Sequence, residues 1–506
     1  MTSADEMYDE LLRLSAKAAV LGSCGSVLGW DRETYMPPAG AEHRSEQLSL
    51  LAGMVHEQTT SARLGELLEA LSETEFDGDA AAVRRANVRE MRRAWQRAVR
   101  LPGRLVSELA KVTALAQQHW AEARGRGDYS IFQPWLEQIV SLKREEAAAV
   151  GIPAGGEPYD ALLDEYEPGA TSATIADVFR GLREQIVPLL QAIRESGRKA
   201  PAEILHRHYS IDAQQKLARQ VAARIGFDFE AGRLDTTTHP FCSGTGPGDC
   251  RLTTRYDEQF FSTSFFGTLH EAGHGMYEQG LPAAAFGTPA GTATSLGIHE
   301  SQSRLWENLV GRSLPFWEGF LPHVQQIFPG VLDDVDVAHF YSAVNSVEPS
   351  FIRVEADEVT YNLHIMLRFD LERALISGDL STADLPAAWD DRFDHDFGMR
   401  PLSAADGCLQ DIHWSAGLFG YFPTYALGNM YASQLFDAAR QQLTDLDDQI
   451  RRGEFQQLLQ WLRSQIHQHG QVHSAAELIQ MASGQPLSDR PLVQHLEQRF
   501  RPLYGI

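Results

Sequence analysis

The sequence predicts a mostly α-helical fold, with one large helical body and a small β element. Apolar residues recur at a spacing of three or four over most of the 506 residues, which is typical of amphipathic helices. Strand-like alternation is rare, and the chain shows no internal repeat, low-complexity tract or long linker. We therefore expect a single domain over residues 1–506.

Four stretches show the helical spacing most clearly, and one stretch favours a strand. The third helical stretch ends before Gly378, and glycine is the residue type most favoured just after a helix. Thr253, Thr254 and Tyr256 give the best strand signal, within residues 251–259. The four helical stretches cover residues 7–14, 101–124, 355–375 and 455–466.

Charge and cysteine content exclude several classes of protein. The chain has 44 basic and 68 acidic residues, a net charge of −24, so it would repel nucleic acid and anionic membrane surfaces. Four cysteines without a C-x-x-C pair favour a reducing compartment, and we expect the cytoplasm. Residues 1–10 lack the order of a signal peptide. The longest uncharged stretch, 279–298, contains two prolines and several glycines, which predicts a loop and no membrane span.

The sharpest chemical signal is an H-E-x-x-H motif at His270, Glu271 and His274. Histidines at i and i+4 lie on one face of a helix, so both imidazoles can reach one metal ion. The glutamate beside the first histidine can take a proton from metal-bound water. The alternative is two surface histidines on an ordinary helix.

A peptidase zinc site needs a third protein ligand, and Glu300 is the natural candidate. It lies 26 residues after His274, on a second helix expected over residues 295–311. Its alternative is an ion pair with Arg304. The adjacent His299 either orients substrate or fills space, and Glu278 either orients His274 or is solvated.

Six motifs follow one another along the chain: His239-Pro240-Phe241, Asp249-x-Arg251-x-Thr253, His270-Glu271-x-x-His274, His299-Glu300-Ser301-Gln302, Ile352-Arg353-x-x-Ala356-Asp357 and Gly407-x-x-Gln410-Asp411-x-His413-Trp414. Their order resembles the carboxypeptidase Taq family of zinc metallocarboxypeptidases over essentially the whole chain. The resemblance implies a saddle-like helical fold with a deep active-site groove, the small β element near the zinc site, and a homodimer. It implies removal of single C-terminal residues from peptides, with Zn²⁺ or sometimes Co²⁺.

An enzyme that removes C-terminal residues must bind a free carboxylate, and arginine does this through a planar two-donor fork. Arg251 and Arg353 are the candidates. Arg353 also lies four residues before Asp357, so its alternative is an ion pair within one helix. His239 precedes a proline and is expected in a rigid loop wall, with a structural or substrate-binding role.

His413 is the candidate donor to the oxyanion of the tetrahedral intermediate. Gln410 and Asp411 are expected to fix its tautomer, and Gln410 is also a candidate for substrate binding. A phenol from Tyr421 or Tyr425 could serve the oxyanion as well, and the sequence leaves the choice between them open. Three of the cysteines lie beside these motifs and are interpreted as packing residues: Cys242, Cys250 and Cys408.

The sequence therefore predicts a zinc-dependent metallocarboxypeptidase whose zinc and substrate motifs lie within about residues 239–425, with Glu271 as general base. The expected partners are peptides with a free C-terminus and a second copy of the chain, with no nucleic acid and no membrane. One alternative is a zinc oligoendopeptidase. A second is a helical binding scaffold with structural zinc, against which Glu271 and the lack of an evident fourth ligand argue.

Overall fold

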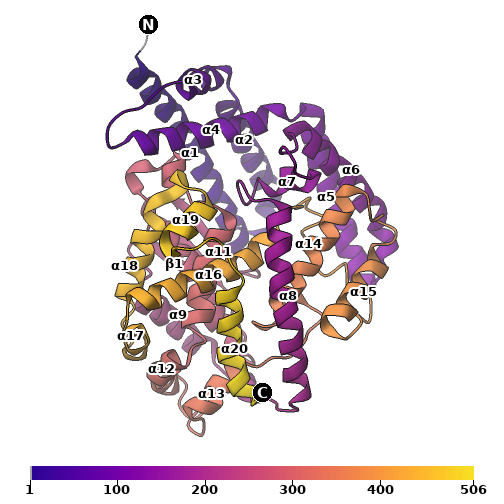
Figure 1. Ribbon diagram of the computed structural model, residues 1–506, viewed down its shortest axis with the longest axis vertical. Helices are drawn as coiled ribbons and strands as arrows, with labels where there is room; N and C mark the ends of the chain where they lie inside the picture. Colours follow the sequence, from indigo (N-terminus) through magenta and orange to yellow (C-terminus); the bar gives the residue numbers. More distant parts are fainter. Residues whose placement is uncertain (1–2) are drawn as a thin grey trace. The chain divides into compact units, whose positions relative to one another are not determined.

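The computed structural model describes residues 3–506, and helices dominate it (Figure 1). Within this range there are only three short strands, which form one small sheet. The predicted fold class, mostly α with a small β element, is confirmed.

The chain divides into two compact units that interleave along the sequence. Unit 1 contains residues 1–99, 201–344 and 432–486, and unit 2 contains residues 100–200, 345–431 and 487–506. The expectation of one catalytic domain over residues 1–506 stays a prediction.

Unit 1 holds the sheet and most of the helices. Its helices are α1 (Ala4–Thr34), α2 (Ala41–Thr59), α3 (Ala62–Ser72), α4 (Ala81–Arg100), α9 (Ile211–Ile225), α10 (Phe261–Glu278), α11 (Leu296–Arg304), α12 (Leu314–Ile327), α13 (Val337–Val344), α17 (Leu446–Arg452), α18 (Gln456–Gln465) and α19 (Ala475–Ser483).

Unit 2 is entirely helical apart from its loops and turns. Its helices are α5 (Gly103–Arg126), α6 (Gln133–Val150), α7 (Pro158–Leu163), α8 (Ser172–Glu195), α14 (Tyr361–Ser377), α15 (Leu385–Phe397) and α20 (Arg490–Tyr504), and α16 (Pro423–Gln442) begins in it and ends in unit 1.

The sheet of unit 1 has the strand order β1-β3-β2, with β1 (Gly232–Thr236) parallel to β3 (Asp249–Thr254) and β2 (Cys242–Gly246) antiparallel to it. The predicted strand at 251–259 is confirmed only for its first part, because β3 ends at Thr254. Helix α10 packs against β2 and β3. The sheet therefore lies beside the helix that carries the H-E-x-x-H motif.

Helix α10 is fixed in place by an aromatic core. Phe261 and Phe265 are one turn apart, both are 1% exposed, and their rings stack on each other. Phe265 also packs against Trp317 of α12, which is fully buried. Burying one such ring contributes roughly 2–3 kcal/mol, so Phe265→Ala should loosen the helix that carries the histidines.

The helical predictions are confirmed in position, with one shifted boundary. Helices α1, α5, α14 and α18 cover the four predicted stretches. Gly378 follows α14 in the left-handed conformation (φ 96°), as expected. The prediction that this helix starts near residue 355 is wrong. Asp357 accepts the backbone N–H groups of Val359 and Thr360, and α14 begins only at Tyr361.

Helix α1 is, among the described residues, the one helix that is long and apolar enough to cross a membrane by length and composition. Its most apolar 18-residue window has a mean hydropathy of 1.3, and 11% of that window is buried. The expected loop at 279–298 contains two short 3₁₀ turns, Ala283–Ala285 and Pro289–Gly291, before α11 begins at Leu296.

Candidate metal centre

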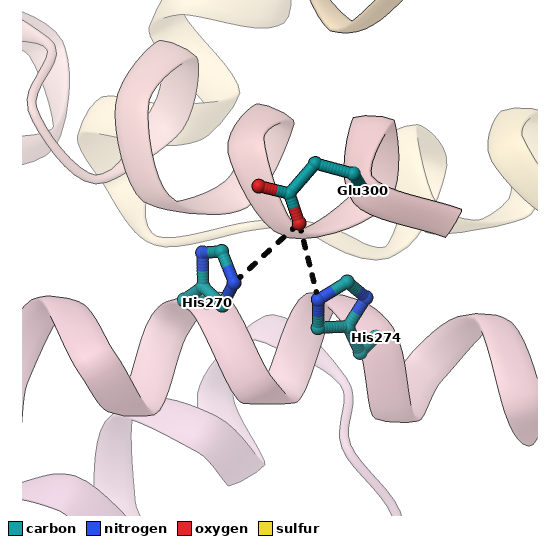
Figure 2. A group of neighbouring side chains, drawn as sticks. All are labelled: His270, His274 and Glu300. Carbon is teal, nitrogen blue, oxygen red and sulfur yellow. Dashed lines mark ion pairs between the residues drawn. The ribbon is translucent and has the colours of Figure 1, made fainter. Parts of the chain in front are cut away.

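Helix α10 brings His270 and His274 to the same face, one turn apart (Figure 2). Opposite them lies Glu300 of α11, whose Oε2 is 3.6 Å from Nε2 of His270 and 3.4 Å from Nε2 of His274. One donor atom from each of the three residues lies within 4.8 Å of the other two. The structure thus brings together the three predicted metal ligands.

Helix α11 starts at a defined cap and lies against α10 at backbone contact. The Ser295 hydroxyl accepts the N–H of Ile298, which fixes the first turn and places Glu300 on the face toward α10. A Cβ at Gly273 would lie 2.5 Å from the carbonyl oxygen of Gln302 and 2.6 Å from Cα of Ser303. Only glycine allows this approach, so Gly273 sets the distance between the two helices.

The donor set fits a zinc ion. Two imidazole nitrogens and one carboxylate oxygen, each about 2 Å from a tetrahedral ion, would lie about 3.3 Å apart. The two measured His–Glu separations are close to this value. Three protein ligands leave one position for water or substrate, which is typical of catalytic and not structural zinc sites.

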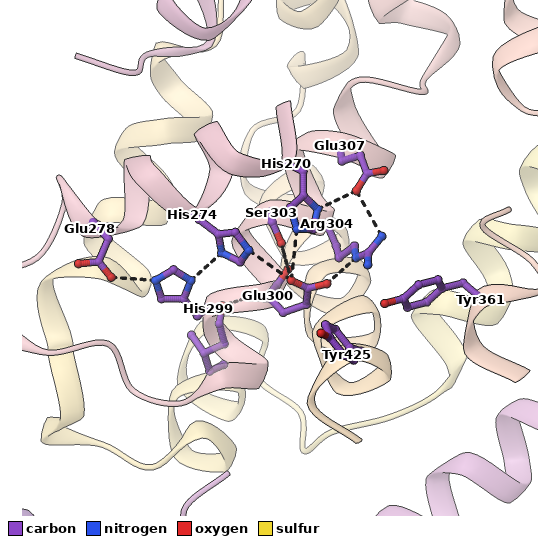
Figure 3. A network of polar contacts seen from close by, with 12 residues as sticks. His270, His274, Glu278, His299, Glu300, Ser303, Arg304, Glu307, Tyr361 and Tyr425 are labelled. Carbon is purple, nitrogen blue, oxygen red and sulfur yellow. Dashed lines mark hydrogen bonds and ion pairs between the residues drawn. The ribbon is translucent and has the colours of Figure 1, made fainter. Parts of the chain in front are cut away.

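Each histidine has a different partner behind it (Figure 3). Nδ1 of His270 is 2.9 Å from Oε2 of Glu307. Nδ1 of His274 is 2.6 Å from Nδ1 of His299, whose Nε2 is 2.8 Å from Oε1 of Glu278. His299 has neither of the two roles considered from the sequence, because it hydrogen-bonds to the ligand His274. Glu278 supports His274 through His299, which favours the first of its two alternatives.

The choice of Nε2 as the ligand atom of His274 determines where the protons lie in the hydrogen bonds that join His274, His299 and Glu278. With Nε2 of His274 as the ligand atom, its Nδ1–H donates to Nδ1 of His299. The proton of His299 is then on Nε2 and is donated to Glu278. The Glu278 carboxylate thus acts on the metal ligand His274 through the neutral imidazole of His299.

Glu300 makes its predicted ion pair with Arg304 and still faces the histidines. Arg304 Nε donates to Oε1 at 2.7 Å, and Ser303 Oγ donates to Oε2 at 3.0 Å. Burial alone would raise the pKa of Glu300, but Arg304 and His270 outweigh it and keep this pKa well below its usual value. The carboxylate therefore stays charged and available to a cation.

Glu271 has the properties of a general base. It is 6% exposed and makes no hydrogen bond or ion pair within residues 3–506. Burial raises its pKa to about 7; His270 opposes this rise, and the nearby Glu300 adds to it. A carboxyl with a pKa near neutrality can both accept and return a proton at working pH.

Strand β3 shows why two of the sequence motifs occur together. Thr253 Oγ1 accepts the N–H of Phe241 at 2.7 Å and donates to its carbonyl, and the N–H of Thr253 donates to the same carbonyl. The His239-Pro240-Phe241 loop is thus anchored to β3, and His239 itself is exposed, as expected for a loop wall.

Arg251 lies on β3 with much of its hydrogen-bonding capacity in use. Its Nε and Nη2 donate to the two oxygens of Asp249 at 2.9 and 2.7 Å, and its guanidinium lies 4.3 Å from the ring centre of Trp30. Its role in substrate binding stays a prediction.

Arg353 belongs to unit 2 and pairs with a residue that its sequence spacing did not suggest. Its Nε and Nη2 donate to Oδ1 of Asp411 at 3.0 and 2.8 Å. The alternative of an intrahelical pair with Asp357 is wrong, because Arg353 lies in a 3₁₀ turn (Arg353–Glu355) ahead of α14. A side-chain partner 58 positions away gives no periodic signal.

Gln410 positions Arg353 and does not touch His413. Its Oε1 accepts the backbone N–H of Arg353 at 2.8 Å, and its Nε2 donates to the backbone carbonyls of Phe351, Asp406 and Gly407. Asp411 is occupied by arginines. The expectation that Gln410 fixes the tautomer of His413 is therefore wrong. For Asp411 it stays a prediction, because Nδ1 of His413 lies 3.9 Å from Oδ1 of Asp411.

His413 lies next to Tyr425 within unit 2. Its Nε2 is 3.3 Å from the Tyr425 hydroxyl. Burial lowers its pKa to about 4; Asp411 opposes this shift and the two neighbouring arginines add to it, so the ring is neutral near pH 7. The rings of Tyr421 and His413 are also in contact. This geometry favours Tyr425 of the two candidate tyrosines.

Sequence reasoning missed two supporting residues. Glu307, behind His270, lies seven positions after Glu300, a spacing of two helical turns that could have indicated it. It is part of a π-helical segment (Leu305–Val310) that directly continues α11. Arg368, the second partner of Asp411, carries no motif signal.

A helical fold with an open His/His/Glu cluster and a buried glutamate beside it defines a metal-dependent peptide hydrolase. The chain belongs to the carboxypeptidase Taq (M32) metallopeptidase family, whose profile matches residues 10–500. It is a metallocarboxypeptidase, as the sequence predicted.

Relatives of this chain match it over nearly their full length. Thermostable carboxypeptidase 1 of Thermus thermophilus is 47% identical over 98% of this chain and 99% of its own. Carboxypeptidase 1 of Bacillus subtilis is 37% identical, with 99% of each chain covered. The crystal structure of the M32 carboxypeptidase from Deinococcus radiodurans is similar with a TM-score of 0.95 and 38% identity, over 99% of this chain and 100% of that one.

Proposed function

We propose that the chain uses zinc to release single amino acids from the free C-termini of peptides. The observation that carries this is the three-ligand cluster with an open fourth position, next to Glu271. When bound, the metal lowers the pKa of its water to about 7 and polarises the scissile carbonyl. Co²⁺ fits the same donor set as a substitute.

The chain's own residues then have the following roles. Glu271 takes the proton of the attacking water and returns it to the leaving amine. His413 and Tyr425 supply hydrogen bonds to the oxyanion, with Tyr421 as the second candidate phenol. Arg353, supported by Gln410, binds the substrate carboxylate, while Arg251 and His239 contribute to substrate binding as the sequence predicts.

Two properties in the proposal concern the setting of the enzyme. We propose a homodimer, supported by the family resemblance, and a cytoplasmic location without nucleic-acid or membrane partners, supported by the net charge of −24 and the cysteine content. All four cysteines are free thiols. Sedimentation equilibrium and fractionation of cells test these two points.

The decisive experiment compares matched peptides that differ only at the C-terminus. N-acetylated peptides with a free carboxylate should be shortened one residue at a time, as read from product masses, and a chelator should stop the reaction. C-amidated peptides should be poor substrates, because amidation removes the charge that the arginine binds and leaves the guanidinium unpaired. Equal cleavage of both at internal bonds would replace this proposal with an oligoendopeptidase.

A further inference from the structure

We propose that Arg368 is a positioning residue for substrate recognition, because it neutralises Asp411 and so leaves the positive charge of Arg353 available for the substrate's terminal carboxylate. This inference rests on the proposed function, in which Arg353 binds that carboxylate. It concerns unit 2 alone.

Asp411 pairs with two arginines, and Nδ1 of the neutral His413 lies farther away, 3.9 Å from Oδ1 of Asp411. Its Oδ1 accepts from Nε and Nη2 of Arg353 at 3.0 and 2.8 Å. Its Oδ2 accepts from Nε of Arg368 at 2.7 Å. Both guanidiniums thus share one carboxylate, and no other carboxylate pairs with either of them in the described part of the chain. The cluster carries one positive charge in excess.

The neighbouring titratable groups leave this excess in place. Burial keeps the pKa values of His413 and His364 below their usual range, so both rings are neutral near pH 7. Two carboxyls follow Arg368 on α14: Asp370 pairs with Arg183 and Arg392. The oxygens of Glu372 accept from Tyr159, Trp414 and the N–H of Gly420 instead of an arginine.

Burial distinguishes the roles of the two arginines. Arg368 is completely buried, its guanidinium lies 4.7 Å from the ring centre of Trp389, and its Nη1 donates to the carbonyl of His364. Arg353 keeps 8% of its side chain exposed. A ligand can therefore meet Arg353 and cannot meet Arg368.

A second buried cation is costly to keep if the only purpose is to anchor one aspartate. An Arg353–Asp411 pair alone would already satisfy both groups, and it would be neutral. With Arg368 present, Asp411 holds Arg353 in a fixed orientation without cancelling its attraction for an anion. The arrangement therefore gives a rigid guanidinium with a net charge.

A charge cycle at two positions tests this inference. The variants are Arg368→Met, Arg368→Lys, Asp411→Asn and the double variant Arg368→Met/Asp411→Asn, with Arg368→Gln used if Arg368→Met does not fold. For each, thermal melting and metal content are checked, and KM and kcat are measured on an N-acetylated peptide with a free C-terminus and on its C-amide.

Arg368→Met should raise KM for the free peptide about tenfold or more, with a much smaller effect on kcat and little change for the amide. Arg368→Lys should stay close to the parent, and the double variant should recover most of the loss because its net charge is restored. If kcat falls alike for both peptides, or the double variant is no better than the single one, Arg368 is only structural. If the parent cleaves both peptides equally, the proposed function itself has failed, which is a separate result.

Discussion

The two histidine ligands are supported by chemically different partners. His270 is hydrogen-bonded directly to the Glu307 carboxylate. His274 is hydrogen-bonded to His299, which in turn is hydrogen-bonded to Glu278. Such supporting bonds fix the ring orientation and the tautomer of a ligand. In the second arrangement His299 lies between the ligand and the carboxylate. Removing His299 therefore leaves Nδ1–H of His274 without its hydrogen-bond acceptor.

Replacing His299 with alanine should weaken metal binding about 10–100-fold, because Nδ1–H of His274 then has no acceptor. The measurement is a competition titration of the apoprotein against a chromophoric zinc chelator. An affinity equal to that of the parent would contradict a supporting role for His299.

Glu271→Gln is the matched contrast at the same site. It should keep the parental zinc affinity, because His270, His274 and Glu300 are untouched, and it should lose nearly all hydrolysis, because the amide cannot accept the proton of water. Parental turnover in this variant would remove Glu271 from the general-base role.

The metal ligands could be predicted from the sequence because they follow a local rule, the spacing of i and i+4 on one helix. The sequence singled out His299 and Glu278 but could not predict that they support His274, since the two residues meet only where α10 and α11 cross. The Arg353–Asp411 pair could not be predicted from the sequence, because it depends on a turn that ends before α14 and on a residue 58 positions later.

The crossing of α10 and α11 is an element-scale feature with a test of its own. Gly273→Ala should destabilise the protein by about 1–3 kcal/mol and lower zinc affinity, because the added methyl group collides with the backbone of Gln302 and Ser303 and displaces Glu300. Thermal unfolding and the same chelator titration measure the two effects.

Gly267 offers a control on the same helix. A Cβ there would meet only Thr254 Oγ1, at an ordinary 3.7 Å. Gly267→Ala should therefore be neutral or stabilising by up to about 1 kcal/mol, as expected for helix propensity. If both variants behaved alike, the contact at Gly273 would not control the spacing of the helices.

At this scale helices were far more predictable than the sheet. Strand β1 contains a glycine and two charged residues, strand β2 contains two glycines, and both show little apolar alternation, so their sequence alone does not favour a strand. They are strands because β3 pairs with both, and that pairing is a tertiary contact. The start of α14 was missed because side-chain bonds of Asp357 compete with helix formation ahead of it.

For the molecule as a whole, buried neutral histidines predict a loss of stability in mild acid. Burial lowers the pKa of His467 to about 3 and that of His413 to about 4, well below the value near 6.5 of an unfolded chain. Below pH 6.5 these two histidines bind more protons in the unfolded state than in the folded state. Their contribution to stability therefore decreases as the pH is lowered. Each such group costs about 2 kcal/mol at pH 5.

Burial raises the pKa values of Glu271 and Glu372 to about 7, and these carboxyls act in the opposite direction. The test is therefore a difference: between pH 7.5 and pH 5 the melting temperature of the metal-free parent should fall relative to that of metal-free His467→Asn. Metal-free protein is used so that release of the ion in acid does not contribute. His43→Asn, at a largely exposed side chain, is the control and should show no such difference from the parent. An equal slope in parent and His467→Asn would show that His467 does not titrate on unfolding.

The interleaving of the two units has a consequence for how the protein is made. Unit 1 needs residues 432–486 to be complete, and unit 2 needs residues 487–506. A ribosome adds roughly 5–20 residues per second, and domains commonly fold as soon as they emerge. Here the metal ligands emerge on the order of ten seconds before their unit can close. During synthesis the packing of α10 on β3, α9 and α12 can already form, but the side of α10 and α11 near Tyr277 and Gln302 stays uncovered until His467 arrives. A chaperone bound near the exit tunnel would meet this part of the metal centre.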